Sequence, residues 1–197
     1  MQQPIAFFDF DGTITTKDTL LEFIRFSKGN ARFNLGFMLS SPWLIAYKLK
    51  VISNQRAKER VLTFFFGRCP VETFTAWCDR FSAEILPGLI RPGALEEIKR
   101  LQTAGIDVVI VSASPENWIR PWTTAMQLSL LATRLEVSGD RLTGKIEGVN
   151  CHGKEKVRRI EAAYELKEYS KIYAYGDTKG DLPMLSLADI RFYKPFR

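Results

Sequence analysis

Histidine and cysteine are scarce in this chain, and their scarcity excludes several kinds of site. Its 197 residues include one histidine, His152, and three cysteines, Cys69, Cys78 and Cys151. The odd number and the spacing of the cysteines argue against a disulfide framework and a zinc site. A Cys–His or Ser–His hydrolase is excluded for want of an orienting group beside the single histidine. We therefore expect a reducing, cytoplasmic location.

Long apolar runs are also lacking. The longest uncharged stretch, Phe33 to Tyr47, has 15 residues, whereas a helix needs about 20 to span a bilayer. The first ten residues, MQQPIAFFDF, have no basic region and only a short apolar run, so we expect no secretory signal. The alternative to a purely cytoplasmic location is peripheral contact with the inner face of an anionic membrane.

Positive charge is concentrated in one segment. The formal net charge is +6, yet residues 25–60 carry eight basic residues against the single acid Glu59. That segment is therefore +7, and the rest of the chain is close to neutral. The pattern predicts one basic surface rather than a basic protein. No nucleic-acid partner is expected, because acids at the strand ends repel polyanions unless a metal is present.

Strand and helix patterns alternate through most of the chain. This alternation predicts an α/β fold, a Rossmann-like parallel sheet with helices on both faces. Gly139–Asp140 is a candidate hairpin turn. The expected strands are 4–10, 106–112, 131–137, 142–149, 171–176 and 189–194, and the expected helices are 92–104, 115–127, 153–167 and 180–187.

A purely helical block interrupts this alternation after the first strand. Breaks are expected at Ser41–Pro42 and Cys69–Pro70, because proline disfavours helix in the residue before it. We expect a core formed by 1–17 and 87–197 and a small all-helical cap formed by 18–86. The candidate cap helices are 18–28, 32–40, 42–52, 54–66 and 71–85.

Polar residues follow three of the expected strands, where ligands bind in such sheets. Asp9 and Asp11 follow the first strand and point the same way if the chain is extended. Ser112–Ser114 follow the second strand, and Asp177 and Asp181 follow a later one. Clustered carboxylates favour a hard cation such as Mg²⁺, and serines beside helix starts suit an anion. Metal and anion together predict phosphoryl transfer.

Each motif alone also has an ordinary structural interpretation. Asp11 could be a helix cap in a solvated turn, Ser112 a small residue at a strand end, and a lysine at a helix start a solvent-exposed cation. The occurrence of all the motifs in this order, each after the expected strand, favours the functional interpretation.

These motifs resemble those of the haloacid dehalogenase phosphohydrolase superfamily. Asp9–Thr13 matches its first motif, Ser112 its second, Gly153–Val157 its third and Gly176–Asp181 its fourth. The resemblance spans residue 5 to about residue 190. The helical insert after the first motif is similar to the cap of the subfamily that includes the phosphoserine phosphatases.

The resemblance implies a Mg²⁺-dependent phosphatase that hydrolyses a phosphate monoester through an aspartyl-phosphate. Asp9 would be the nucleophile, and Asp11 the general acid and then the base. Magnesium would be held by Asp9, the backbone carbonyl of Asp11, and Asp177, with Asp181 orienting the metal shell.

Phosphate and substrate contacts are also implied by the resemblance. Ser112, Ala113 and a lysine of the third motif would bind the phosphoryl oxygens. Lys156 fits the related pattern better than Lys154, which is the second choice. Asp18 lies nine residues after Asp9, where phosphoserine phosphatases place a glutamate that grips the substrate amine.

Two positions depart from the family pattern. Ala113 stands where glycine is common in the second motif. Gly180 stands where phosphoserine phosphatases frequently have an asparagine that contacts the substrate. Arg60 is a candidate for gripping a substrate anion from the cap.

The stretch 33–52 is apolar at 13 of 20 positions, and it has two interpretations. It is either the core of the cap or an interfacial surface. In the second case apolar side chains enter lipid and basic ones meet anionic headgroups. The apolar set is Phe37, Trp43, Leu44 and Ile45, and the basic set is Arg32, Lys48 and Lys50.

With this insert the sequence is also similar to bacterial phosphatidylglycerophosphate phosphatases of the haloacid dehalogenase type. Ser114–Pro115 and Lys179 match features of that group. The implied partner is a lipid phosphate or, alternatively, a phosphorylated small molecule of the phosphoserine type. A phosphotransferase using the same intermediate and a non-enzymatic binding module are the other hypotheses.

Overall fold

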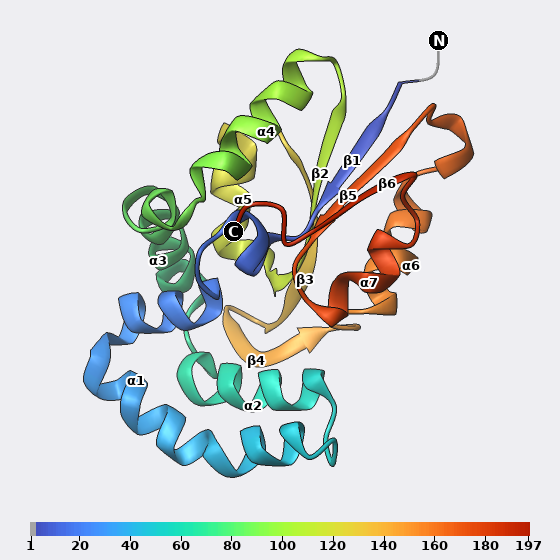
Figure 1. The fold of residues 1–197 in the computed structure, drawn as a ribbon. Coiled ribbons are helices and arrows are strands. Elements are labelled where there is room, and N and C mark those ends of the chain that lie inside the picture. Colours follow the sequence, from blue (N-terminus) through green and yellow to red (C-terminus); the bar gives the residue numbers. More distant parts are fainter. Residues whose placement is uncertain (1–2) are drawn as a thin grey trace.

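A six-stranded sheet forms the centre of the molecule, as the computed structural model shows for residues 3–197 (Figure 1). The structure does not describe the side chains at positions 44 and 47. The predicted contact of Leu44 with lipid therefore lies outside the described residues. The strand order is β4-β3-β2-β1-β5-β6, and all neighbours are parallel except β3 and β4. The predicted α/β fold is confirmed. The strands are β1 (Ile5–Phe8), β2 (Asp107–Pro115), β3 (Ser129–Ser138), β4 (Arg141–Glu147), β5 (Ile172–Gly176) and β6 (Ile190–Tyr193).

Helices cover both faces of the sheet. Alternate residues of β1 point to opposite sides, and because these residues are apolar, each side has to be buried. Ala6 and Phe8 pack in a cluster with α4 (Pro92–Thr103) and α5 (Glu116–Ala125). Ile5 and Phe7 pack in a second cluster with α6 (Lys154–Ala163) and α7 (Leu182–Leu185). The hairpin turn predicted at Gly139–Asp140 joins β3 to β4, which pair in antiparallel fashion.

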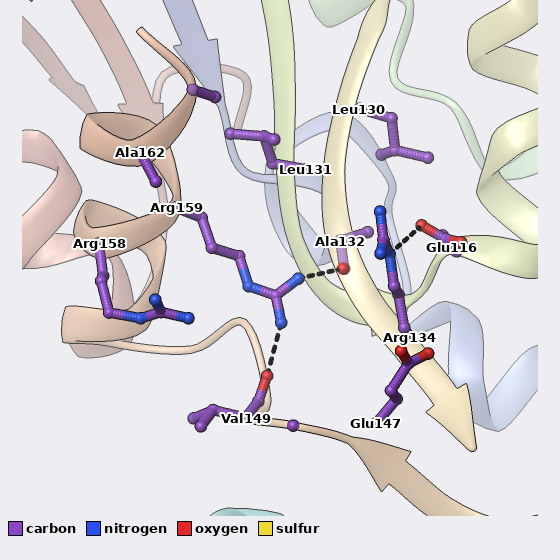
Figure 2. Close-up of a pocket in the computed structure, with 12 residues that line it drawn as sticks. Glu116, Leu130, Leu131, Ala132, Arg134, Glu147, Val149, Arg158, Arg159 and Ala162 are labelled. Carbon is purple, nitrogen blue, oxygen red and sulfur yellow. Dashed lines mark hydrogen bonds and ion pairs between the residues drawn. The ribbon is translucent and has the colours of Figure 1, made fainter. Parts of the chain in front are cut away.

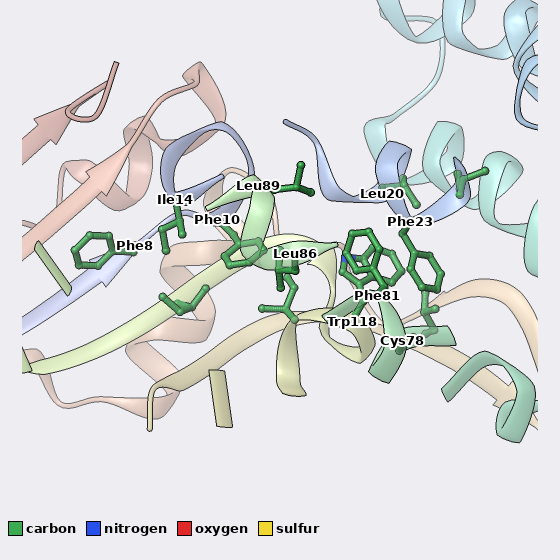
Figure 3. Close-up of a cluster of buried hydrophobic side chains, with 14 of the residues drawn as sticks. Phe8, Phe10, Ile14, Leu20, Phe23, Cys78, Phe81, Leu86, Leu89 and Trp118 are labelled. Carbon is green, nitrogen blue, oxygen red and sulfur yellow. The ribbon is translucent and has the colours of Figure 1, made fainter. Parts of the chain in front are cut away.

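The insert consists of α1 (Thr19–Lys48), α2 (Asn54–Phe66) and α3 (Val71–Glu84), which lie at one end of the sheet (Figure 1). Phe23 of α1 stacks on Trp118 of α5, with ring centroids 4.6 Å apart. Figure 3 shows that one apolar cluster runs from Phe8 in the sheet to Phe23 and Phe81 in the insert. Hydrophobic packing is therefore continuous between sheet and insert.

The break predicted at Ser41–Pro42 is wrong, because α1 continues through Pro42. Proline cannot donate the usual backbone hydrogen bond to the carbonyl four residues earlier. The Ser41 hydroxyl donates to that carbonyl, on Met38, at 2.7 Å. The change of direction comes instead at Gly29, whose φ of +76° is a left-handed conformation that glycine tolerates. The break predicted at Cys69–Pro70 is confirmed, since α3 begins at Val71.

The apolar stretch divides between the core and the surface. The ring of Phe37 lies 4.5 Å from that of Phe33 and 6.1 Å from that of Phe65, and this side chain is half-buried. Trp43 and Ile45 are 41% and 57% exposed, as the interfacial interpretation requires. No helix within residues 3–197 is both long and apolar enough to cross a bilayer.

Candidate active site

The loop after β1 brings the first motif to the end of β5. The chain leaves the strand at Phe8 and makes a short helical turn, Phe10–Ile14. Gly12 has a φ of +83°, and a Cβ there would lie 2.6 Å from Oδ2 of Asp177. Only glycine therefore allows the two motifs to approach so closely. Asp9 and Asp11 line the same cavity, although the turn rather than strand periodicity places them.

Asp9 is a buried carboxylate, 6% exposed, with one cation and one hydroxyl beside it. Its Oδ1 accepts a hydrogen bond from Nζ of Lys156 at 2.5 Å, and its Oδ2 accepts from the Thr13 hydroxyl at 3.0 Å. Burial raises the pKa of Asp9 to about 7, even though the Lys156 ammonium opposes that rise. The carboxylate is therefore poorly solvated and responsive to any added positive charge.

Three carboxylates converge here. Oxygens of Asp9, Asp177 and Asp181 lie within 4.8 Å of one another. Such a set of buried oxygen donors suits a hard divalent cation. The carboxylate of Asp11 lies outside this set, and its Oδ1 accepts hydrogen bonds from the backbone N–H and the hydroxyl of Thr19, both at 2.6 Å.

The two fourth-motif aspartates are held differently. Oδ2 of Asp181 accepts from the backbone N–H and hydroxyl of Thr178, at 2.9 and 2.7 Å, which fixes the turn after β5. Asp177 lies within reach of the Thr13 hydroxyl, at 3.2 Å, and forms an ion pair with Arg197. Asp181 thus orients the turn and lines the cavity, whereas Asp177 does not line it and is paired with Arg197.

The structure distinguishes the two candidate lysines. Lys156 is 1% exposed, and its Nζ lies 2.5 Å from Asp9 and 2.7 Å from Asp181. Burial alone would lower the pKa of Lys156, but these two carboxylates raise it, so the lysine stays charged. Lys154 lies at the first residue of α6 and is exposed. The geometry therefore favours Lys156.

Residues of the second motif lie deeper than expected. Strand β2 continues to Pro115, so the strand end predicted at residue 112 is three residues early. Ser112 is fully buried, and its hydroxyl accepts from the Ser114 backbone N–H at 3.0 Å. Ala113 and Ser114 line the cavity. This cavity has a volume of about 230 Å³ and collects residues from the first, second, third and fourth motifs.

A family model described as haloacid dehalogenase-like hydrolase matches residues 6–186. The protein CicA of Caulobacter vibrioides is 35% identical over 194 residues, covering 96% of this chain and 85% of that protein. The chain belongs to the haloacid dehalogenase-like hydrolase family. A probable phosphatase of Mycobacterium tuberculosis is 30% identical, covering 91% of this chain and 64% of that protein.

A solved structure of a substrate-bound phosphoserine phosphatase complex superposes with a TM-score of 0.72 and 19% identity, covering 98% of this chain and 86% of that one. These findings confirm the predicted membership of the superfamily and the resemblance to phosphoserine phosphatases in fold. They also confirm the prediction of a hydrolase of the phosphatase type.

Asp18 of this haloacid dehalogenase-like hydrolase lies at the cavity, but its carboxylate already caps α1. Its Oδ1 accepts from the Leu21 backbone N–H at 3.1 Å. Burial, followed by the nearby charge of Asp11, raises the pKa of Asp18. The side chain is open to solvent on one side and faces the cavity on the other.

Sequence reasoning missed Lys58 and misplaced Arg60. Lys58 of α2 lines the cavity, and its Nζ donates to the backbone carbonyl of Ala113 at 3.0 Å. Arg60 lies 4.4 Å from the ring centroid of Trp43, in a different pocket. Residues two apart on a helix point about 200° apart, so only one of them can face the site. No motif marks Lys58, and the signal that could have found it is its position one turn after Asn54, another cavity residue.

A second cavity, of about 390 Å³, lies between α6 and β3 (Figure 2). Its central cation is Arg159, which donates to the backbone carbonyls of Ala132 and Val149. Arg134 lies 3.7 Å from Glu116. These cations are already engaged by protein oxygens, and the cavity contains none of the predicted site residues.

The raised pKa of Asp9 predicts how stability changes with pH when metal is removed. The folded-state pKa of about 7 exceeds the ordinary value of 3.8, so the folded protein binds this proton more tightly. The resulting stabilisation is complete below about pH 4 and is lost as pH rises through about 7. In chelator, the wild-type free energy of unfolding should fall by about 2–3 kcal/mol relative to Asp9→Asn between about pH 5 and pH 7.5. Urea titrations measure this, and a difference independent of pH would contradict it.

Proposed function

We propose that this hydrolase is a Mg²⁺-dependent phosphomonoesterase that uses Asp9 as a nucleophile. The main support for this proposal is the buried Asp9 carboxylate. It lies 2.5 Å from Lys156, is grouped with Asp177 and Asp181, and borders a cavity. Positioning and neutralisation of charge supply most of the catalysis in phosphoryl transfer. This arrangement combines a positioned nucleophile with a fixed cation.

In the proposed reaction, an oxygen of Asp9 attacks phosphorus, and the bond from phosphorus to the ester oxygen breaks. Asp11 donates a proton to the departing alkoxide, which leaves as an alcohol. Asp11 then accepts a proton from water, whose oxygen attacks phosphorus and releases inorganic phosphate from Asp9. Lys156 donates to phosphoryl oxygens, and Thr19 holds the Asp11 carboxylate in place through its two short hydrogen bonds.

Residues around the carboxylate cluster fit a magnesium ion. Asp9 and Asp177, with the backbone carbonyl of Asp11, would hold it, and Asp181 would orient the surrounding groups. The donor set supports this, because three carboxylates are grouped here with oxygens within 4.8 Å. When bound, Mg²⁺ neutralises charge that develops on the phosphoryl oxygens.

The insert 18–86 would act as a cap that excludes water and selects the substrate. Four of its residues, Asp18, Leu20, Asn54 and Lys58, line the cavity together with residues of the core. The cap therefore contributes directly to the space that the leaving group would occupy.

A lipid phosphate is the substrate class that the outer surface of the cap supports. Exposed apolar side chains lie along the second half of α1 and the loop after it, and we call them the apolar stripe. Trp43 of this stripe borders a pocket of about 430 Å³ that three cations, Arg56, Arg60 and Lys145, and one acid, Glu59, also line. None of these three cations pairs with a carboxylate among the side chains that the structure describes. The apolar stripe is Leu35, Met38, Leu39, Trp43, Ile45, Leu49 and Val51, all at least 41% exposed.

Apolar side chains beside unpaired cations are the composition of a surface that binds an anionic membrane. Peripheral contact with the inner face would bring the cavity to a lipid phosphate. The alternative small-molecule substrate, of the phosphoserine type, is supported by Asp18, whose carboxylate borders the cavity.

The purified protein should release phosphate from phosphatidylglycerophosphate, and chelation should abolish the release until Mg²⁺ is restored. Phosphoserine assayed alongside separates the two substrate classes. Turnover of phosphoserine alone would support the small-molecule alternative, and turnover of neither would refute the proposed activity. An added alcohol that captures phosphate would indicate phosphotransfer.

Membrane contact can be checked separately with vesicles that contain phosphatidylglycerol. Ile45→Ser combined with Leu49→Ser should weaken binding about 100-fold or more, because each removes an apolar side chain worth about 1.5 kcal/mol or more on burial. Val137→Ser, at a residue 49% exposed on β3, is the matched control and should bind normally. Binding of all variants equal to wild type would exclude the apolar stripe.

A further inference from the structure

His152 and Gly180 face each other at the edge of the cavity. A Cβ built on Gly180 would lie 2.5 Å from Nε2 of His152 and 3.1 Å from two of its ring carbons. Real Cβ atoms do not approach other atoms this closely. The imidazole therefore occupies the space that any side chain at position 180 would need, and the absence of a side chain there permits its position.

We infer that His152, admitted by Gly180, contacts the leaving group of the phosphate ester and favours one that presents hydroxyl or ester oxygens over one that presents an ammonium. This inference rests on the proposed phosphatase function. It assigns substrate selection to a pair of residues that are 28 positions apart in the sequence.

The surroundings of His152 support contact with a ligand. It lines the same cavity as Asp11, Lys58 and Lys156. Its imidazole makes no hydrogen bond within residues 3–197, whereas the Lys58 ammonium beside the cavity is held by Ala113 and Asn150. An uncommitted ring that borders the proposed reaction centre is therefore available to a bound molecule.

The charges of this part of the cavity support an oxygen-bearing leaving group. Burial, and then the charges of Lys156 and Lys58, lower the pKa of His152, so the ring is neutral near pH 7 and can donate or accept. Burial lowers the pKa of Lys58, although the charges of Asp11 and Asp18 oppose this, and in its charged form Lys58 would repel a substrate amine. The Asp18 carboxylate lines the same cavity and accepts from the Leu21 backbone N–H, which leaves it lone pairs for a ligand. It is therefore the group that a substrate amine would use, and the preference for oxygen rests on His152 and Lys58. Hydroxyl and ester oxygens suit both Lys58 and His152.

A double-mutant cycle on His152 and Gly180 tests the inference. His152→Ala should raise KM for phosphatidylglycerophosphate and sn-glycerol 3-phosphate about tenfold, the effect of losing one hydrogen bond. It should change kcat and the KM for phosphoserine by less than about twofold. Gly180→Ala should produce the same KM increase, because its Cβ displaces the ring. In the His152→Ala background, Gly180→Ala should add nothing.

His152→Gln should restore much of the lost affinity, because it retains a donor and an acceptor. The inference is overturned if His152→Ala leaves KM unchanged for every substrate that the wild type hydrolyses. It is also overturned if Gly180→Ala has the same effect with and without His152. A wild type that hydrolyses none of the three substrates refutes the proposed function instead, so the two failures are distinguishable.

A measurement that needs no catalytic turnover tests whether the His152 ring and a side chain at position 180 exclude each other. His152 is the only histidine, so one imidazole signal titrates in the NMR spectrum. In Gly180→Ala the ring should move outward, and the pKa of His152 should return toward its ordinary value. An unchanged titration in Gly180→Ala would show that the two residues do not exclude each other, and would overturn the inference.

Discussion

Asp9→Asn should lower kcat by about 10⁴-fold or more, because the amide cannot attack phosphorus and the covalent route is lost. The change is almost isosteric, and the amide oxygen can still accept from Lys156 while the amide NH2 can donate to the Thr13 hydroxyl oxygen. Loss of activity should therefore occur in a folded protein. Phosphate release under Mg²⁺, with folding checked by circular dichroism, provides the measurement.

A second measurement on the same variant isolates the intermediate. Acid quenching of the wild type with ³²P-labelled substrate should trap a phosphorylated protein, and Asp9→Asn should trap none. Turnover by the variant at a rate near that of the wild type would remove Asp9 from the mechanism, and with it the proposed function.

Lys156→Met should destabilise the protein by about 3–5 kcal/mol, the cost of breaking a buried ion pair by removing one partner. Asp9 and Asp181 would be left buried without the ammonium that lies 2.5 and 2.7 Å from them. Activity should fall about 10²- to 10³-fold as well, because a fixed cation at the phosphoryl oxygens is lost. Urea unfolding and steady-state kinetics measure the two effects.

Lys154→Met is the matched control, because it makes the same change two residues earlier on an exposed side chain of the same helix. It should alter stability by less than about 0.5 kcal/mol and leave the kinetics unchanged. If Lys154→Met were the more damaging variant, the assignment of the third-motif lysine would be reversed.

The fold and the centre of the site could be predicted because they depend on local patterns. Apolar strands with polar residues at their carboxyl ends place Asp9 and Asp177 at one edge of the sheet, and Asp181 lies in the turn that follows β5. Lys156 could be preferred over Lys154 because the motif distinguishes them, and its burial agrees with that choice.

Errors arose where a specific side-chain contact, within one helix or between elements, decides the outcome. Pro42 remains within a helix because the Ser41 hydroxyl serves the carbonyl that proline leaves unpaired. Lys58, not Arg60, reaches the cavity because the helix presents one face to β2 and β4, and its rotation is set by tertiary packing. The contact of His152 with Gly180 joins distant positions, and no local pattern records it.

The start of α1 is fastened to the catalytic loop. The backbone N–H and hydroxyl of Thr19 hold Asp11, and Phe23 stacks on Trp118 of α5. If the insert opens to admit a bulky ester, the pivot cannot lie at the start of α1, since that would pull Thr19 away from Asp11, the proposed proton donor. Gly29, where the helix already changes direction, is the natural hinge. The mobile lid would then begin a third of the way along α1, and everything before it would belong to the stationary half of the enzyme.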